Sequence, residues 1–283
     1  MNHATAIRAV CFGLVCVAIA ACSASLGSLP AAAPGSSAPP AAVAAAQPTE
    51  TERKREEYIA HAFAQRPPAW LTGFRRVGTG TGFYIADNKV LTNFHVAGSC
   101  ARLTVGNGVE GAEISATLIA GDPAADLAVI GTKAAMATPA RFETALYTET
   151  GKDLAVVGYP SYGLVVLEAQ LSPVSTAEAN LMTSRRTYAF RGSVRPGNSG
   201  SPVLDDTGTV LGVVSAQIDT VAVYRKTGHI VDNIGLAIAN QAVFRFLHAH
   251  KIAFLPPVPG NVLTSDQLLK KARQFVRQVG CWR

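Results

Sequence analysis

The stretch Pro196-Gly197-Asn198-Ser199-Gly200-Ser201-Pro202 places one serine on a tight, glycine-flanked turn between two apolar segments. Glycine has no side chain, so a carbonyl group can approach the Ser199 hydroxyl closely. Such a turn can also direct the amides of Gly197 and Ser199 toward one point, as the stabilisation of an oxyanion requires. A serine hydroxyl becomes nucleophilic when a base takes its proton. The stretch therefore predicts a nucleophile, whose base and orienting acid must lie elsewhere in the chain.

Candidates for both partners occur earlier in the sequence. His95 follows the apolar segment 90–94, and Asp126 directly precedes the apolar segment 127–130. The order of the three residues along the chain is then His95, Asp126 and Ser199. This is the order found in chymotrypsin-type sites, and it differs from the orders in subtilisin and the α/β-hydrolases.

Four short motifs together resemble the signatures of HtrA-type trypsin-like serine proteases, over roughly residues 74–250. They are Gly80-Thr81-Gly82-Phe83, Thr92-Asn93-Phe94-His95-Val96, Asp126-Leu127-Ala128-Val129 and Gly197-Asn198-Ser199-Gly200. The resemblance implies a serine endopeptidase that hydrolyses peptide bonds in proteins or peptides through an acyl-enzyme intermediate. His95, Asp126 and Ser199 would be its catalytic residues, and the amides of Gly197 and Ser199 its oxyanion hole. No cofactor and no metal are implied.

The composition favours an all-β fold. Of the 283 residues 48% are hydrophobic and 16% charged, which is enough to bury a sizeable core, and short Val-, Ile- and Thr-rich segments alternate with turn signals. With the resemblance, we expect two six-stranded antiparallel β-barrels of chymotrypsin type, short N- and C-terminal helices, and a site in the cleft between the barrels. Gly106-Asn107-Gly108 predicts a tight hairpin between strands 102–105 and 109–120. Residues 239–250 are expected to form a helix that closes the second barrel.

The N-terminus predicts export. Residues 1–21 contain an apolar stretch too short to span a bilayer, which is typical of a signal peptide. Ile19-Ala20-Ala21-Cys22 resembles the lipobox of bacterial lipoproteins, so Cys22 is the expected lipid-attachment residue, and ordinary signal-peptide cleavage is the alternative. Ser23 follows Cys22, and by resemblance to enterobacterial sorting rules this indicates the outer membrane. We therefore expect a periplasmic protein that a lipid holds at the membrane.

Four further segments follow the predicted signal peptide. Residues 22–49 are rich in Ala, Pro and Ser and are expected to be a disordered tether. Residues 50–69 have the pattern of a short amphipathic helix. Residues 70–250 would be the protease domain, and residues 251–283 a tail packed on it. PDZ domains usually follow the protease in the resembled family, but only 33 residues follow His250, and we expect none there.

Two cysteines are candidates for a disulfide in an oxidising compartment. The signal peptide and the lipid account for the other three, which leaves Cys100 and Cys281. Thr264 and Gln267 fit a capping box that begins a tail helix. The apolar residues expected on one face of that helix are Leu268, Ala272, Phe275, Val276 and Val279. If this face covers the first barrel, Cys281 comes close to Cys100, and two unpaired thiols are the alternative.

The substrate pocket is predicted from position alone. In the resembled fold the floor of the pocket lies six residues before the nucleophile, which is Ser193 here. Ser215, Ala216 and Gln217 are the expected wall. A pocket for a basic side chain would need a carboxylate to pair with the cation. We therefore expect a small to medium, uncharged residue on the acyl side of the cleaved bond.

Several other interpretations compete with this one. A non-catalytic binding protein on the same scaffold is the main alternative. An esterase is a second alternative, but the turn around Ser199 lacks the Gly-x-Ser-x-Gly elbow of that class. Asp122 competes with Asp126, but it precedes a proline as a turn-forming residue does. Asn198 is neutral where digestive relatives carry the acid that pairs with a new N-terminus, so activation by cutting is not expected. The net charge of +6 is not clustered and implies no nucleic acid; the oligomeric state stays open.

Overall fold

The computed structural model describes residues 50, 53, 68–107, 113–133, 138–144, 153–162, 165–166, 169–176, 186–217, 225, 228 and 233–283. The predicted signal peptide, Cys22, the tether and all but four residues of the predicted 50–69 helix region lie outside these residues. Within the part of the chain that is described, no helix is long and apolar enough to cross a membrane.

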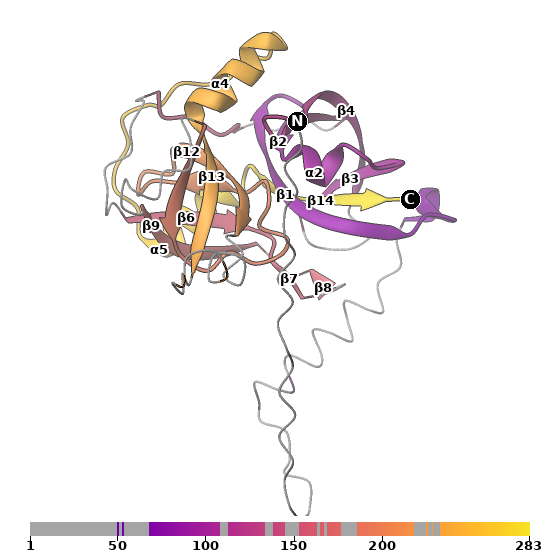
Figure 1. Ribbon diagram of the computed structural model, residues 1–283, viewed down its shortest axis with the longest axis horizontal. Coiled ribbons are helices and arrows are strands. Elements are labelled where there is room, and N and C mark those ends of the chain that lie inside the picture. Colours follow the sequence, from indigo (N-terminus) through magenta and orange to yellow (C-terminus); the bar gives the residue numbers. More distant parts are fainter. Residues whose placement is uncertain are drawn as a thin grey trace, which may run out of the picture. The chain divides into compact units, whose positions relative to one another are not determined.

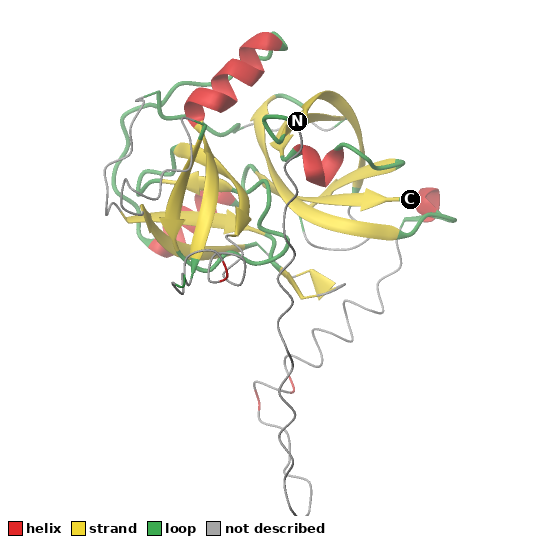
Figure 2. Ribbon diagram, in the orientation of Figure 1, coloured by secondary structure: helices red, strands yellow, loops and turns green. Residues whose placement is uncertain are grey.

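Two closed antiparallel β-barrels form the fold, as predicted (Figures 1 and 2). The first contains β1 (Arg76–Ala86), β2 (Lys89–Thr92), β3 (Arg102–Gly106), β4 (Ile114–Asp122), β5 (Leu127–Thr132) and β14 (Val276–Trp282). The second contains β6 (Asp153–Gly158), β9 (Gln170–Thr176), β10 (Thr187–Arg191), β11 (Pro202–Leu204), β12 (Val210–Gln217) and β13 (Ile234–Ala239). A separate short pair is formed by β7 (Ser161–Tyr162) and β8 (Val165–Val166).

Few helices accompany the barrels in the described residues. A 3-10 turn, η1 (Ala69–Leu71), precedes β1, and the four-residue helix α2 (Phe94–Ala97) follows β2. The predicted helix after β13 is α4 (Asn240–Ala249), which packs against β12 and β13 (Figure 1). The tail helix is α5 (Ser265–Ala272), and Thr264 and Gln267 form the predicted capping box at its start.

The tail corrects one prediction. Helical spacing predicted a helix as far as Gly280, but α5 ends at Ala272, and residues 276–282 form β14. In Figure 1 this yellow strand lies against the indigo β1, and it pairs with β1 on one side and β3 on the other. Burial explains the change, because all residues of β14 except Arg277 are buried, and only a strand can complete the first barrel there. The tail is therefore part of the barrel and does not merely cover it.

The predicted tight hairpin after β3 is also wrong. The last residue pair of β3 and β4 is Val105 with Ile114, so the connection is longer than a Gly-Asn-Gly turn. Residues 108–112 of this connection lie outside the described part of the chain. In the observed register Ala116 and Ala120 of β4 are buried, whereas Leu118 and Ile119 are exposed. The hydrophobic residues of this strand therefore do not mark its register, and the Gly-Asn-Gly signal was the only local guide.

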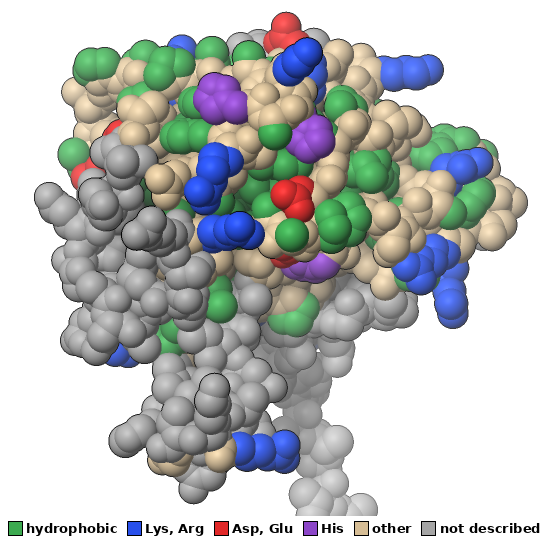
Figure 3. Space-filling model, turned by 45° about the horizontal axis from the view of Figure 1, so that its top comes forward, with side chains coloured by type: hydrophobic (Ala, Val, Ile, Leu, Met, Phe, Trp, Pro, Cys, Tyr) green, Lys and Arg blue, Asp and Glu red, His purple; other side chains and the backbone are tan. Residues whose placement is uncertain are grey.

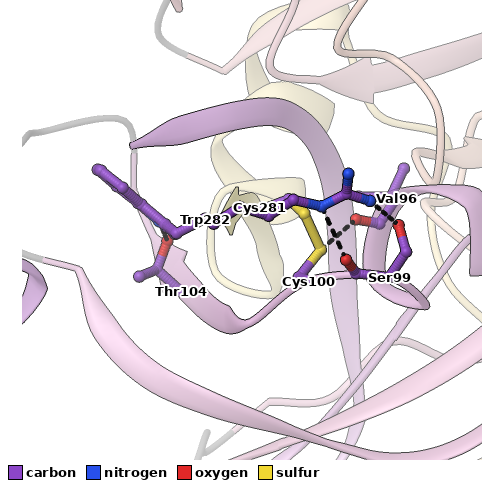
Figure 4. The surroundings of a disulfide bond; sticks show 7 residues. Val96, Ser99, Cys100, Thr104, Cys281 and Trp282 are labelled. Carbon is purple, nitrogen blue, oxygen red and sulfur yellow. Dashed lines mark hydrogen bonds between the residues drawn. A yellow bond between two sulfur atoms is a disulfide. The ribbon is translucent and has the colours of Figure 1, made fainter. Parts of the chain in front are cut away.

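A disulfide joins the last strand to the segment after α2 (Figure 4). Cys100 and Cys281, 181 positions apart in sequence, are bonded, with their Cα atoms 5.2 Å apart. The predicted pairing is thus present, with Cys281 inside a strand and not just beyond the end of a helix. Beside it, Trp282 donates a hydrogen bond from Nε1 to Thr104 Oγ1 (3.0 Å), and Arg283 donates from Nη2 to Ser99 Oγ (2.8 Å). These bonds hold the end of β14 to β3 and to the segment before it.

Candidate active site

Both barrels contribute the three residues predicted as catalytic. His95 lies on α2, Asp126 directly before β5, and Ser199 in the turn before β11. The backbone amide of His95 donates to Asp126 Oδ1 (3.0 Å), and Asn93 donates from Nδ2 to the Asp126 carbonyl (3.0 Å). Asp126 has a φ of 53°, a left-handed conformation that is uncommon outside glycine. Two hydrogen bonds from the α2 segment therefore hold Asp126, one at its backbone carbonyl and one at its carboxylate, so that the carboxylate faces His95.

The His95 ring contacts the Asp126 carboxylate directly. Nδ1 lies 3.0 Å from Oδ1 and 2.9 Å from Oδ2. Burial alone would raise the pKa of Asp126. Hydrogen bonds from the His95 ring and amide and from Ser215 lower the pKa by more than burial raises it, so the pKa lies below its ordinary value. An ionised carboxylate at Nδ1 favours the tautomer that carries its proton there. Nε2 is then left free to accept a proton.

Ser215 has a contact that sequence reasoning missed. Its hydroxyl donates to Asp126 Oδ2 (2.8 Å), although it was predicted only as a wall of the substrate pocket. The bond joins β12 of the second barrel to the acid of the first. The two residues are 89 positions apart, and no spacing or composition signal connects them. Only the folded arrangement of the barrels reveals that Ser215 helps to orient the acid.

The hydroxyl of Ser199 points toward β12 in this structure. Its Oγ donates to the carbonyl oxygen of Ser215 (3.3 Å), and its hydrogen bond is not to His95. The His95 side chain is 50% exposed and that of Asp126 27%, so the pair lies open to an approaching substrate. Rotation about the Cα–Cβ bond of Ser199 moves Oγ between staggered positions. Catalytic hydrogen bonds are often loose without substrate and tighten when it binds.

The turn around Ser199 depends on its glycines. Gly197 has a φ of 91° and Gly200 a φ of 86°, both in the region that side chains disfavour. A Cβ atom on Gly197 would collide with the carbonyl of Tyr159, and one on Gly200 with the carbonyl of Thr81. The glycine requirement predicted from sequence therefore has two causes, the backbone conformation and the close approach of neighbouring backbone.

The predicted pocket residues are only partly described. Ser193 is exposed and lies between β10 and the Ser199 turn. Ala216 and Gln217 belong to β12, but their side chains are outside the described part of the chain, as are most of residues 218–232. The preference for an uncharged residue therefore stays a prediction.

The alternative acid has a structural role. Asp122 accepts hydrogen bonds at Oδ1 from the amides of Ala124 (2.8 Å) and Ala125 (3.1 Å), as a turn-forming residue does. This leaves Asp126 as the carboxylate that contacts His95.

On the face drawn in Figure 3, Lys and Arg side chains lie in several separate places among hydrophobic and polar ones. That face does not resemble the continuous basic surface of a nucleic-acid-binding protein.

Comparison with known proteins identifies related chains. Residues 80–213 match the family model "Trypsin-like peptidase domain". Serine protease Rv3671c of Mycobacterium tuberculosis is 34% identical over 157 residues, which are 51% of this chain and 38% of the relative. The uncharacterized protein y4bJ of Sinorhizobium fredii is 31% identical over 207 residues (71% and 32%), and a probable periplasmic DegP-like serine endoprotease of Chlamydia pneumoniae is 29% identical over 171 residues (59% and 33%). The chain thus spans about a third of the length of these curated relatives.

Solved structures agree in fold. The crystal structure of the inactive form of Rv3671c protease is 27% identical, with a TM-score of 0.50, over 62% of this chain and 86% of that one. A serine endoprotease from Yersinia pestis is 19% identical, with a TM-score of 0.50, over 68% of this chain and 66% of that one. The second similarity concerns the fold alone.

Proposed function

Residues 80–213 form a trypsin-like peptidase domain that is homologous to HtrA-type serine proteases. From this premise we propose that the chain is a serine endopeptidase. One observation carries the proposal: the Asp126 carboxylate lies 2.9 Å from Nδ1 of His95, in a chain whose Ser199 turn has the glycine geometry that a nucleophile requires. Fold and family alone would not establish activity, since unrelated functions share one fold.

The proposed mechanism is acyl transfer. Nε2 of His95 takes the proton of Ser199 as Oγ attacks the substrate carbonyl, while Asp126 holds the ring and stabilises the positive charge that forms. The amides of Gly197 and Ser199 stabilise the oxyanion of the tetrahedral intermediate. His95 then protonates the leaving amine, and water hydrolyses the acyl-enzyme with His95 again as base. Ser215 supports the acid through its bond to Asp126 Oδ2.

Protein or peptide chains are the proposed substrates. The uncharged Ser193 at the predicted pocket floor favours cleavage after small to medium, uncharged residues. The Chlamydia pneumoniae relative is named as a probable periplasmic protein, and this similarity supports the proposal that the present chain is exported. The lipobox-like sequence at Cys22 adds attachment to the outer membrane. Membrane fractionation of the parental chain and Cys22→Ser tests the anchor, because only the parental protein should partition with membranes and detergent.

Labelling with a fluorophosphonate probe tests the proposed activity. The parental chain should be labelled and should cleave casein, whereas Ser199→Ala should lose both and His95→Ala should lose about 10⁴-fold or more in rate. Thermal unfolding of each variant serves as the control, because both substitutions are at accessible positions and should leave the fold intact. A folded parental chain that is neither labelled nor active would instead indicate a binding protein on this scaffold.

A further inference from the structure

Four successive peptide units in the Ser199 turn have hydrogen-bonded carbonyl groups. Pro196 O accepts from Ser161 N (2.7 Å), Gly197 O from Thr81 Oγ1 (2.7 Å), Asn198 O from Ser201 N (3.0 Å) and Ser199 O from Thr81 N (2.8 Å). Because a peptide unit is planar, a carbonyl held in one direction also fixes the N–H of the same unit. One residue of the opposite barrel, Thr81, therefore holds two of the four units.

The position of Thr81 matters for the proposed oxyanion hole. The amide of Ser199 belongs to the unit between the two that Thr81 holds. The amide of Gly197 belongs to the unit directly before them, which Ser161 holds. Loosening the Thr81 contacts would therefore release the backbone on both sides of the Ser199 amide and on one side of the Gly197 amide.

The Thr81 hydroxyl is itself fully engaged. Thr81 lies on β1 and is completely buried. Its Oγ1 accepts a hydrogen bond from the amide of Tyr159 (2.9 Å) while donating to Gly197, which leaves the hydroxyl one orientation. Thr92 donates from Oγ1 to the Thr81 carbonyl (2.6 Å) and fixes the backbone there. The first barrel thus holds the Ser199 turn by hydrogen bonds from a side chain that has a single orientation.

We infer that Thr81 is a positioning residue that keeps the amides of Gly197 and Ser199 directed at the developing oxyanion. The inference rests on the proposed function, because an oxyanion forms only during acyl transfer. An interaction that acts on the transition state more than on bound substrate changes kcat more than KM. A change to Val tests the hydroxyl alone, since Val has the shape of Thr but cannot donate to Gly197 or accept from Tyr159. The backbone bond from Thr81 N to Ser199 O is kept, so the peptide unit directly before the Ser199 amide is the one released.

Three variants separate positioning from simple destabilisation. Thr81→Val should lower kcat by about 10- to 100-fold, a smaller decrease in kcat than removal of a complete oxyanion donor causes. KM should change by less than about threefold. Thr81→Ser keeps the hydroxyl and should restore most of kcat. Thr104→Val is the matched control, because Thr104 is also buried in the first barrel and its hydroxyl also accepts a bond, from Trp282. It should lower the melting temperature comparably but leave kcat near the parental value.

Hydrogen–deuterium exchange supplies a readout that does not depend on turnover. The peptide spanning residues 196–201 should exchange faster in Thr81→Val than in the parental chain, and at the parental rate in Thr104→Val. Unchanged exchange there in Thr81→Val, or equal losses of kcat in both valine variants, would overturn the inference. If the parental chain is inactive but the exchange difference is present, the proposed function fails, while the conclusion that Thr81 holds the backbone of the Ser199 turn is supported.

Discussion

The two barrels of this chain pair their strands in the same way but are assembled differently from the sequence. In the second barrel β6 lies between β9 and β11, and all six strands fall within residues 153–239. In the first barrel the equivalent place, between β1 and β3, is taken by β14, from the other end of the described domain. The same closed barrel thus results from two chain orders, so the pairing pattern and not the order of strands decides this fold.

The discontinuous barrel is the one that carries His95 and Asp126. The Cys100–Cys281 disulfide ties β14 to a residue five positions after His95. The second barrel supplies Ser199 and its turn from one continuous segment. His95 and Asp126 therefore lie in a barrel that is completed by a strand more than 140 residues after them in the sequence. Ser199 lies in the continuous barrel, but its turn also contacts the first barrel through Thr81.

Removing β14 should have the largest effect. A chain ending at Gln274 loses four buried apolar side chains of this strand, Val276, Val279, Cys281 and Trp282, together with the buried Gln278. At about 1.5–3 kcal/mol for each large side chain, this loss is comparable to the whole stability of a typical domain. The edges of β1 and β3 are also left unpaired. We expect no cooperative unfolding transition by circular dichroism, and no activity.

The control for that truncation removes only Arg283, which lies beyond β14 and is exposed. This control loses only the hydrogen bonds of Arg283 to Ser99 and Arg75 and keeps every buried side chain of β14, so it should unfold within a few degrees of the parental temperature. A chain ending at Gln274 that melts like the parental chain would show that the first barrel does not need β14.

Breaking the disulfide should have the next largest effect, confined at first to the first barrel. With 181 positions between the cysteines, the chain-entropy model gives about 5 kcal/mol as an upper figure for its contribution. Cys100→Ala/Cys281→Ala should therefore unfold at lower denaturant concentration, with faster hydrogen exchange in β3 and β14 than in the second barrel. A reductant should destabilise the parental chain but not this variant. Equal unfolding midpoints without reductant would contradict the prediction.

The sequence predicts the site better than the tail, for a physical reason. The contact between His95 and Asp126 and the glycine turn at Ser199 follow from residues that glycine, charge and apolar segments mark locally, and the catalytic role of the three residues stays a prediction. The tail was assigned to a helix because the residues from Leu268 to Val279 fit helical spacing, and a fully buried strand has no alternating pattern to contradict it. The contacts of Ser215 and Thr81 join the two barrels, and no local pattern carries that information.

A smaller effect is expected from the hydrogen bond that Ser215 of the second barrel donates to Asp126 of the first. The pKa of Asp126 is below the ordinary value of about 3.9. The ionised carboxylate therefore contributes stability above that pH, and this contribution is lost as the pH falls through the folded-state pKa. Ser215→Ala removes one of the bonds that lower this pKa. The variant should be less stable by about 1 kcal/mol at pH 7, with the difference shrinking as the pH falls through the pKa of Asp126 in the folded chain.

Urea unfolding of the parental chain and Ser215→Ala between pH 7 and 2.5 measures this difference. Ser115→Ala is a suitable control, because Ser115 is an exposed serine on β4. A stability difference that stays constant over the whole pH range would show that the Ser215 hydroxyl acts on something other than the ionised Asp126.

The smallest effect should come from moving β14 to the front of the first barrel. β14 runs antiparallel to β1, with Arg76 opposite Trp282, and Arg75 and Arg283 exchange two backbone hydrogen bonds, Arg75 N to Arg283 O (2.8 Å) and Arg283 N to Arg75 O (3.0 Å). A short Asn-Gly turn can therefore connect residue 283 to residue 75 as a hairpin. The rearranged chain would begin with residues 274–283, continue through the Asn-Gly turn to residue 75, and end after α5. Because it lacks residues 1–74, which include the buried Leu71, its reference is a chain that begins at residue 75. Because every strand pair is kept, we expect a melting temperature within a few degrees of that reference and similar fluorophosphonate labelling. Loss of folding with this hairpin, in contrast, would mean that chain order itself matters to the first barrel, and that the equivalence of the two barrels extends only to their final pairing.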